Sequence, residues 1–264
     1  MPVVTLLTDF GTKDSYVAEM KGVIISICPE AQIIDLSHQI EKFNVRMGAF
    51  TLASAITYFP EKTIHVAVVD PGVGTKRRPI IVETKRCSYV GPDNGILMLS
   101  AQKEEIKHVC KISNPLFMLS RVSKTFHGRD IFAPAAAHLA NGSSPLEFGS
   151  EVYDYVVPKF AKPEIRGNQL FGEIMHIDDF GNVVSNISVE DLRKVGAKEN
   201  VFFNVELRGK VFRLRFCSVY GDVPVGQLLA LVGSHDFLEF SVNQENAAKK
   251  FKVSIGDSVR LLWG

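Results

Sequence analysis

The sequence predicts an α/β protein in two parts: an N-terminal, largely parallel sheet flanked by helices, and a C-terminal all-β barrel domain. Two observations predict this class. Through residues 1–160, short apolar runs alternate with longer segments of helical periodicity, which is the pattern of a parallel sheet covered by helices. Over residues 168–264 the apolar runs become short and closely spaced, which is typical of a small β-sandwich or barrel.

The elements of the N-terminal part alternate in type. Helix periodicity ends at Pro29 in the first helix, and Asp130 is the expected N-cap of the last one. We expect strands at residues 3–9, 31–36, 63–70, 79–84 and 88–91, and helices at 15–28, 45–59 and 131–140.

A change of character separates the two parts. Pro158, Pro163 and Gly167 punctuate a charged stretch, so we expect domains at 1–160 and 168–264 joined by a linker near 161–167.

The C-terminal part reads as a series of short strands. Its one expected helix covers residues 188–195, with Ser188 as N-cap and Asp191 completing a capping box. The strands are expected at 171–177, 182–187, 200–207, 211–219, 227–233, 237–242, 251–255 and 258–263.

The overall charge excludes some partner classes. Thirty basic residues face 29 acidic ones, so the chain has no net field to attract nucleic acid or an anionic membrane. No apolar stretch approaches the roughly 20 residues that span a bilayer. The cluster Lys76-Arg77-Arg78 is the local exception.

The cysteines and the first residues indicate a cytoplasmic protein. The four cysteines are widely spaced and form no CxxC pair, so we expect neither a zinc site nor a disulfide framework. Met1-Pro2 leads directly into an apolar run without a basic segment, which favours a first strand over a signal peptide.

Familiar cofactor and hydrolase motifs are absent. The sequence holds no GxxxxGK[ST], GxSxG or HExxH, and Gly72 and Gly74 lack the third glycine of a dinucleotide-binding loop. A metal site from Asp9, Asp70, His127 and His176 has no supporting ligand spacing. We therefore expect no metal and no separate cofactor.

Three strand ends in the N-terminal part share a polar residue followed by a loop rich in Gly and Asp. These loops are residues 9–14, 70–74 and 91–95. Ligands of open α/β sheets bind beyond the carboxyl ends of the strands, so Asp9 and Asp70 are site candidates. Because Asp and Gly are also good turn formers, a purely structural role remains open.

Asp70, Arg77 and His127 form the strongest local constellation. Asp70 ends an expected central strand, and the short loop after it can return Arg77 toward it. An acid, a guanidinium and an imidazole near strand ends would position and polarise a water. The alternative is a structural ion pair between Asp70 and Arg77, with His127 an ordinary loop histidine.

Two turns in the C-terminal part carry further polar residues. Residues 178–182 (DDFGN) suit a hairpin turn, and residues 233–240 (GSHDFLEF) contain a second turn. Glu239 falls among apolar neighbours, where a buried carboxylate needs a partner such as a ligand ammonium group.

Taken together, six segments resemble one known family. TDFGTKDSYVAEMKG, VVDPGVGTKRR, GPDNG, TFHGRDIFAPAAAHLA, IDDFGN and GSHDFLEF occur in the order and at the intervals of the S-adenosylmethionine hydroxide adenosyltransferases, which are related to the bacterial fluorinase and chlorinase. The resemblance covers essentially the whole chain. It implies a homotrimer whose active sites lie between the N-terminal domain of one subunit and the C-terminal domain of its neighbour.

The resemblance also implies a reaction, in which S-adenosylmethionine and water give adenosine and L-methionine. Asp70, Arg77 and His127 match the set around the attacking water. The substrate-binding positions that it implies are Asp9 for the ribose diol, Phe43 for the ribose pocket, Asp14, Asp178, Ser234 and His235 for the methionine moiety, Phe180 and Asn182 for adenine, and Phe237, Glu239 and Val242 beside them.

Two other functions remain as alternatives: a 5′-halogenase using chloride, and a non-catalytic adenosine-binding protein. The fluorinase has an aromatic residue in place of Asp70, a Tyr-Ser pair in place of His127-Gly128, and a long insertion where this chain runs directly through PIIVETKRCSYVG. A carboxylate facing the nucleophile would repel a halide but not water, which favours the hydrolase.

Overall fold

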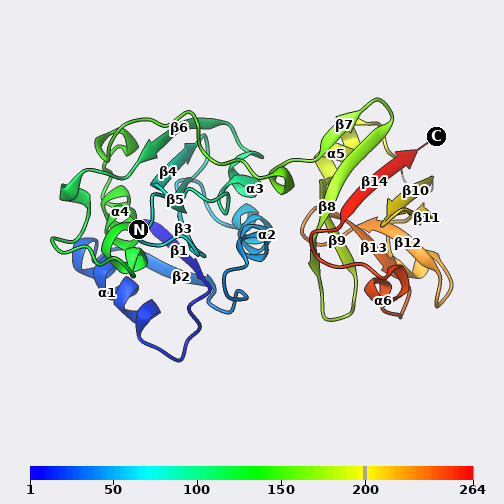
Figure 1. Ribbon diagram of the computed structural model, residues 1–264, viewed down its shortest axis with the longest axis horizontal. Coiled ribbons are helices and arrows are strands. Elements are labelled where there is room, and N and C mark those ends of the chain that lie inside the picture. The colour runs from blue at the N-terminus through cyan, green and yellow to red at the C-terminus, as the bar shows by residue number, and fades with distance from the viewer. Residues whose placement is uncertain (199–200, 264) are drawn as a thin grey trace. The chain divides into compact units, whose positions relative to one another are not determined.

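The structure is a computed structural model that describes residues 1–198 and 201–263. It divides into two compact units, Met1–Pro158 and Lys159–Gly264, which Figure 1 shows as an α/β part and a β part. Strand β7 (Glu164–Arg166) occupies part of the segment that we expected to be a linker.

The first unit is built on a six-stranded sheet in the order β2-β1-β3-β5-β4-β6. Strands β2, β1, β3 and β5 run parallel to one another, whereas β4 runs antiparallel to both β5 and β6. Only three residues connect β4 to β5, and so short a connection can join only antiparallel strands. The bounds are β1 Val3–Thr8, β2 Gln32–Ser37, β3 Ile64–Val68, β4 Pro79–Thr84, β5 Ser88–Pro92 and β6 Ile106–Lys111. Strand β6 was not predicted from the sequence.

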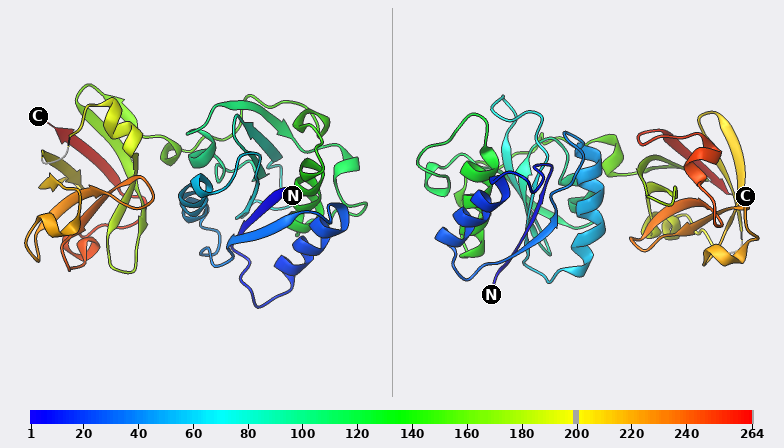
Figure 2. Two further views of the ribbon diagram at one scale, coloured as in Figure 1. Left: turned by 180° about the vertical axis from the view of Figure 1, so that it is seen from behind. Right: turned by 90° about the horizontal axis from the view of Figure 1, so that it is seen from below.

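Helices cover both faces of this sheet. Helices α1 (Tyr16–Ile27) and α4 (Ala133–Ala140) lie together on one face, and α2 (Val45–Ala55) lies on the other (Figure 2, right). The short α3 (Met98–Ala101) follows β5 and is fully buried. Because both faces are covered, the central strand β3 is buried along its whole length, which explains its unbroken apolar run.

The helix expected at 131–140 differs from the prediction at its start. A π-helical turn, Gly128–Phe132, precedes α4, and His127 lies directly before this turn without capping it through its side chain. Asp130 lies inside this turn, and its buried carboxylate accepts hydrogen bonds from the Ser123 backbone N–H and the Arg129 Nε, both at 2.7 Å. The prediction of Asp130 as N-cap is therefore wrong, since this carboxylate holds the incoming loop rather than the helix end.

The second unit is a closed barrel. Its strands follow the order β14-β10-β11-β12-β13-β9-β8, pairing of β14 with β8 closes the cylinder, and β7 pairs with β8 outside it. Closure leaves few open strand edges. The bounds are β8 Gln169–Ile177, β9 Val183–Ser188, β10 Phe202–Leu207, β11 Lys210–Phe216, β12 Leu228–Val232, β13 Phe237–Val242 and β14 Ser258–Trp263. The first residue of the strand expected at 200–207 lies outside the described residues. This unit and the first together confirm the predicted fold class.

Of the helices α5 (Val189–Lys194) and α6 (Ala247–Phe251) in the barrel unit, the sequence analysis predicted the first and missed the second. Helix α5 is confirmed, with its capping box formed by Ser188 and Asp191. The strand expected at 251–255 is wrong, because Phe251 ends helix α6, which the sequence did not predict. Asn246 caps the start of α6, and the left-handed Lys252 stops it.

Within the described residues, none of the helices combines the length and the apolar character needed to cross a membrane.

Candidate active site

The carboxyl ends of β1, β3 and β5 lie side by side at one edge of the sheet, because these strands are adjacent and parallel. The three predicted loops therefore meet there. The loop after β5 has a structural role: Asp93 is buried and pairs with Arg78 at 2.6 Å. The Asn94 side chain donates to the Val69 carbonyl at 2.8 Å, which fixes the chain immediately before Asp70.

Asp70, Arg77 and His127 are in direct contact. Arg77 Nε donates to Asp70 Oδ1 at 2.9 Å, and Arg77 Nη2 donates to Asp70 Oδ2. The same Nη2 lies 2.9 Å from Nδ1 of His127. The side chains of Arg77 and Asp70 are only 9% and 5% exposed, so their ion pair is largely shielded from solvent. Asp70, Arg77 and His127 therefore form one hydrogen-bonded chain in that order.

The state of His127 follows from its neighbours. An arginine can only donate, so Nδ1 of His127 accepts and the ring proton resides on Nε2. Burial lowers the pKa of His127, and the Arg77 charge lowers it further, against smaller opposing effects of Asp70, Asp130 and a hydrogen bond to the Ser123 backbone. His127 is therefore a neutral imidazole with an N–H on the nitrogen that faces away from Arg77.

The loop that carries Arg77 is packed tightly against the segment leading to His127. Gly74 has a φ of +74°, and a Cβ at this position would lie 2.3 Å from the Lys124 carbonyl oxygen. A side chain here would clash and would also be strained. This glycine therefore allows the two loops to approach closely enough for Arg77 to bind His127.

Arg77 retains an unused donor group. Its Nη1 atom is buried and has no hydrogen-bond partner among the described residues. The guanidinium lies 5.2 Å from the centre of the Phe132 ring. Buried N–H groups are nearly always matched by an acceptor, so this unmatched donor is an unusual feature of the site.

A cavity of about 410 Å³ opens beside these residues. Asp70 and His127 line it, together with three of the predicted substrate-binding positions, Asp9, Asp14 and Phe43. All five come from the strand-end side of the first unit. Arg77, the remaining predicted site residue of this unit, is connected to the cavity through its contacts with Asp70 and His127.

Asp9 and Phe43 are linked within this cavity. The Asp9 side chain is buried, and its Oδ2 accepts from the Phe43 backbone N–H at 2.9 Å. Lys42 Nζ donates to the Asp9 carbonyl oxygen. Phe43 has a left-handed φ of 64° and is 68% exposed. A bulky residue in this conformation is uncommon and strained, which is a typical property of residues in binding sites.

A second cavity, of about 570 Å³, lies in the barrel unit. It is lined by four predicted positions: Asp178, Phe180, Asn182 and Val242. The first three belong to the β8–β9 hairpin turn, where Asp178 accepts from the Asn182 backbone N–H at 2.8 Å and from its side-chain amide at 2.9 Å. The Phe180 side chain is 81% exposed, so a large apolar surface stands open at this cavity.

The remaining predicted positions do not line that cavity. Ser234 and His235 are exposed in the turn between β12 and β13, whereas Phe237 is buried in β13. The Glu239 carboxylate is buried and accepts from the Tyr220 hydroxyl at 2.8 Å and from the Ser241 hydroxyl at 2.6 Å. The expected partner of this carboxylate is thus found within the chain.

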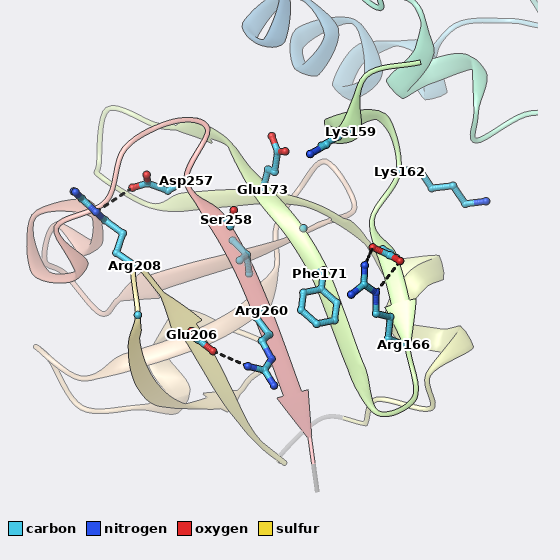
Figure 3. Close-up of a pocket in the computed structure, with 14 residues that line it drawn as sticks. Lys159, Lys162, Arg166, Phe171, Glu173, Glu206, Arg208, Asp257, Ser258 and Arg260 are labelled. Atoms are coloured by element: carbon cyan, nitrogen blue, oxygen red, sulfur yellow. Dashed lines mark hydrogen bonds and ion pairs between the residues drawn. The ribbon is translucent and has the colours of Figure 1, made fainter. Parts of the chain in front are cut away.

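A larger cavity, of about 910 Å³, lies elsewhere on the barrel and contains no predicted residue. Figure 3 shows several of its charged side chains paired with one another, as in Arg260–Glu206 at 3.0 Å and Arg208–Asp257 at 3.9 Å, whereas Lys159 and Lys162 stand apart from these pairs. Ion pairs between exposed side chains are weak, and each charge in such a pair is already balanced by its partner. We therefore do not place the active site there, although this cavity is the larger one.

Both site cavities are also lined by residues that the sequence analysis did not assign to a site, among them Tyr16, Lys42 and Tyr220. Lys42 precedes the predicted Phe43, so the same segment contained the signal. Tyr220 is remote in sequence from every predicted position, and nothing in its surroundings distinguishes it. Across the part of the chain that the structure describes, no three His, Cys, Asp or Glu side chains are grouped to hold a metal ion.

Comparison with known proteins gives a consistent picture. Residues 4–149 match the SAM hydroxide adenosyltransferase N-terminal domain, and residues 172–260 match the C-terminal domain. A protein from Methanocaldococcus jannaschii named (R)-S-adenosyl-L-methionine hydrolase is 34% identical over 100% of this chain and 97% of its own length. A protein of the same name from Thermus thermophilus is 35% identical over 99% of this chain and 100% of its own length.

A more distant relative is named for a different reaction. A fluorinase from an Actinoplanes species is 27% identical, over 98% of this chain and 96% of its own. A crystal structure of an uncharacterized conserved protein from Thermotoga maritima superposes with a TM-score of 0.85 at 38% identity, covering 98% of this chain and 99% of that one. The matched domains, with the relatives that span the full length, show that this chain belongs to the SAM hydroxide adenosyltransferase family.

Proposed function

We propose that this chain hydrolyses S-adenosyl-L-methionine to adenosine and L-methionine, by in-line attack of water on ribose C5′. The observation that carries the proposal is the contact of Asp70, Arg77 and His127 at the cavity of the first unit. The names of the full-length relatives, hydrolases at 34–35% identity and fluorinases at 26–27%, support water as the nucleophile.

The chemistry needs little beyond placement. A bond forms between the water oxygen and C5′ while the C5′–S bond breaks, and its electron pair stays on sulfur. The sulfonium leaves as a neutral thioether, so no general acid, metal or cofactor is required to activate it. One proton must leave the attacking water. The protein has to align water with the C5′–S bond and exclude competing solvent.

The three residues divide this task. His127 has its proton on Nε2, so it orients the water by donating to one lone pair and does not act as the base. Each Asp70 oxygen accepts one bond from Arg77 and keeps a lone pair free. We assign the water proton to Asp70. The proton passes to Asp70 while the oxygen bonds to C5′, so the oxygen gains hydroxide character as the C5′–S bond breaks.

Arg77 has two roles in this scheme. It fixes the orientation of both Asp70 and His127 through three hydrogen bonds. Its positive charge, which these bonds hold beside Asp70 and His127, stabilises the attacking oxygen as the proton leaves.

The substrate contacts are assigned to both cavities. In the first unit, Asp9 binds the ribose hydroxyls with the lone pairs left free by Phe43, while the exposed Phe43 ring covers the ribose. In the barrel unit, Phe180 and Asn182 bind adenine. Around the methionine moiety we place Asp14, Asp178, Ser234 and His235, with Phe237 and Val242 as apolar support.

We propose a homotrimer, as the family resemblance implies, and the division of the site residues between two cavities supports a site shared between subunits. The predicted residues fall into two cavities, one in each unit, and each exposes a large aromatic side chain, Phe43 or Phe180. In the proposed trimer, the first cavity of one subunit faces the barrel cavity of its neighbour. All four cysteines are buried and unpaired, which supports a cytoplasmic location.

Two alternatives can be separated from hydrolysis in one experiment. Purified protein is incubated with S-adenosyl-L-methionine in ¹⁸O-labelled water, with and without chloride, and the products are identified by chromatography and mass spectrometry. We expect adenosine with one ¹⁸O atom at C5′, and methionine without label. A chloride-dependent 5′-chloro product would establish a halogenase. Retention of adenosine without turnover would establish a binding protein.

A further inference from the structure

Tyr220 forms part of the wall of the barrel cavity, beside Phe180 and Asn182. It lies in a short helical turn, Tyr220–Asp222, and is 42% exposed. Its hydroxyl does not face solvent but donates to Glu239 Oε1 at 2.8 Å. The residue thus presents a ring to the cavity while a buried carboxylate holds its far end.

The position of Glu239 in β13 explains how it reaches Tyr220. Leu238, Phe240 and Val242 belong to the barrel core, and side chains alternate along a strand, so Glu239 and Ser241 point outward. Both are nevertheless buried, at 6% and 0% exposure.

The segment that precedes β12 covers this outer surface. Cys217 and Val223 pack with Leu229 and Leu231 of β12, and Asn243 donates to the Val223 carbonyl at 2.7 Å. Tyr220 belongs to this covering segment. The carboxylate beneath it therefore ties the segment to the barrel wall.

Glu239 lies behind the wall of the cavity rather than on it. Oε1 receives hydroxyls from Tyr220 and Ser241, and Glu239 does not line the cavity. Burial raises the pKa of Tyr220, and the hydrogen bond to Glu239 raises it further, so the tyrosine hydroxyl stays a donor over the whole working pH range.

We propose that Glu239 is a positioning residue that, with Ser241, locks the Tyr220 ring as a fixed wall for the adenine-binding part of the site. This inference rests on the proposed function for its substrate. It replaces the expected contact of Glu239 with a ligand ammonium group by an indirect role. A pre-positioned ring saves the entropy of ordering it when the substrate binds, so the lock should act on binding rather than on the chemical step.

Three variants test the lock. Tyr220→Phe keeps the ring and removes the hydroxyl, and Glu239→Ala removes the acceptor. Each is expected to raise KM about fivefold, the effect of one hydrogen bond, with kcat within about twofold because the chemistry lies elsewhere. Glu239→Gln keeps an acceptor oxygen for Tyr220 and should restore KM to near the wild-type value.

The double variant Tyr220→Phe/Glu239→Ala separates a shared role from two independent ones. If Glu239 acts through Tyr220, the double variant has the KM of either single variant, since coupled residues are not additive. The matched control is Tyr153→Phe, which removes a tyrosine–carboxylate hydrogen bond of 3.2 Å to Glu151 in the first unit. Its KM should not change.

Calorimetric titration with adenosine supplies a readout that does not depend on turnover. Tyr220→Phe is expected to weaken adenosine binding by the same factor as it raises KM. If Tyr220→Phe binds adenosine like wild type, or if Glu239→Gln is impaired more than Tyr220→Phe, the lock is refuted. A wild-type protein that binds adenosine but forms none would refute the hydrolase instead, and the titration would still decide on the lock.

Discussion

The Nη2 atom of Arg77 lies 2.9 Å from Nδ1 of His127, and this contact fixes the tautomer of the imidazole. Because arginine only donates, protonation of Nδ1 would set an N–H against an N–H. The contact therefore makes the set sensitive to acid. Burial and the Arg77 charge lower the pKa of His127 from its ordinary value of 6.5, so the neutral form persists at pH 7.

The first prediction concerns pH. We expect kcat/KM to be constant above pH 7 and to fall only at a pH below 6.5, where His127 gains a proton. The free energy of unfolding should change in the same direction. Between the lowered pKa of His127 in the folded protein and its ordinary value of 6.5, the unfolded chain binds more protons than the folded one. The folded protein therefore loses stability as the pH falls through that window. A pH series of kinetics and thermal unfolding measures both.

The control for this prediction is His127→Asn, whose side-chain oxygen can take the place of Nδ1 as acceptor. This variant should lose about 10²-fold or more in kcat, since the Nε2–H is gone, and its residual activity should show no fall between pH 7 and 5.5. If the activity of the variant still fell at low pH as it does in the wild type, a group other than His127 would be responsible for the fall.

The second prediction tests the ion pair of Asp70 and Arg77. Asp70→Asn leaves a buried guanidinium without its counter-charge, which costs about 3–5 kcal/mol of unfolding free energy, and removes the proposed proton acceptor. We expect a loss in kcat of about 10²- to 10⁴-fold. Asp154→Asn is the matched control, because Asp154 also pairs with an arginine but is 85% exposed. Its melting temperature and kcat should equal those of wild type.

Much of the first unit could be predicted because local patterns and the fold agree there. The run that forms β3 is buried throughout, and the rule that parallel strands place their carboxyl ends at one edge was sufficient to group Asp9 with Asp70. The contact between Arg77 and His127 depends on how two loops pack around Gly74. The spacing of residues in the sequence does not predict this packing.

Where prediction failed, a tertiary interaction outweighed a local signal. Asp130 has the chemistry of an N-cap, but in the structure it binds Ser123 and Arg129. The run at 251–255 has the composition of a strand, yet Asn246 and the left-handed Lys252 enclose a helix ending at Phe251. Tyr220 could not be identified, since only the fold brings it to Glu239.

The third prediction concerns the strained backbone at Phe43. Phe43→Gly relieves the left-handed conformation while keeping the N–H that binds Asp9, so the protein should become more stable by up to about 1 kcal/mol. Loss of the ring should raise KM by about three- to tenfold. Lys62→Gly is the control, because Lys62 has a similar φ of 66° and lines neither site cavity. It should gain stability without a change in KM. A Phe43→Gly variant with unchanged KM would remove Phe43 from the substrate site.

The fourth prediction tests whether active sites form between subunits. Asp70→Asn inactivates the cavity of the first unit and Asn182→Ala impairs that of the barrel unit, so each variant alone should have little activity. Sedimentation of the wild type should give three times the 29.2 kDa of one chain. The two variants are then co-expressed in equal amounts with different affinity tags, and the mixed oligomers are isolated.

In these mixed trimers, an intact first cavity from one chain can meet an intact barrel cavity from its neighbour. Each mixed trimer contains two chains of one variant and one of the other, so one of its three interfaces forms such a site, and we expect about a third of wild-type activity. Mixing the separately purified oligomers without exchange of subunits should give none, which controls for simple addition of residual activities. If each chain instead forms its site from its own two units, no chain in the mixture has both cavities intact. The co-expressed protein would then be as inactive as its parents, and the shared active site would be ruled out.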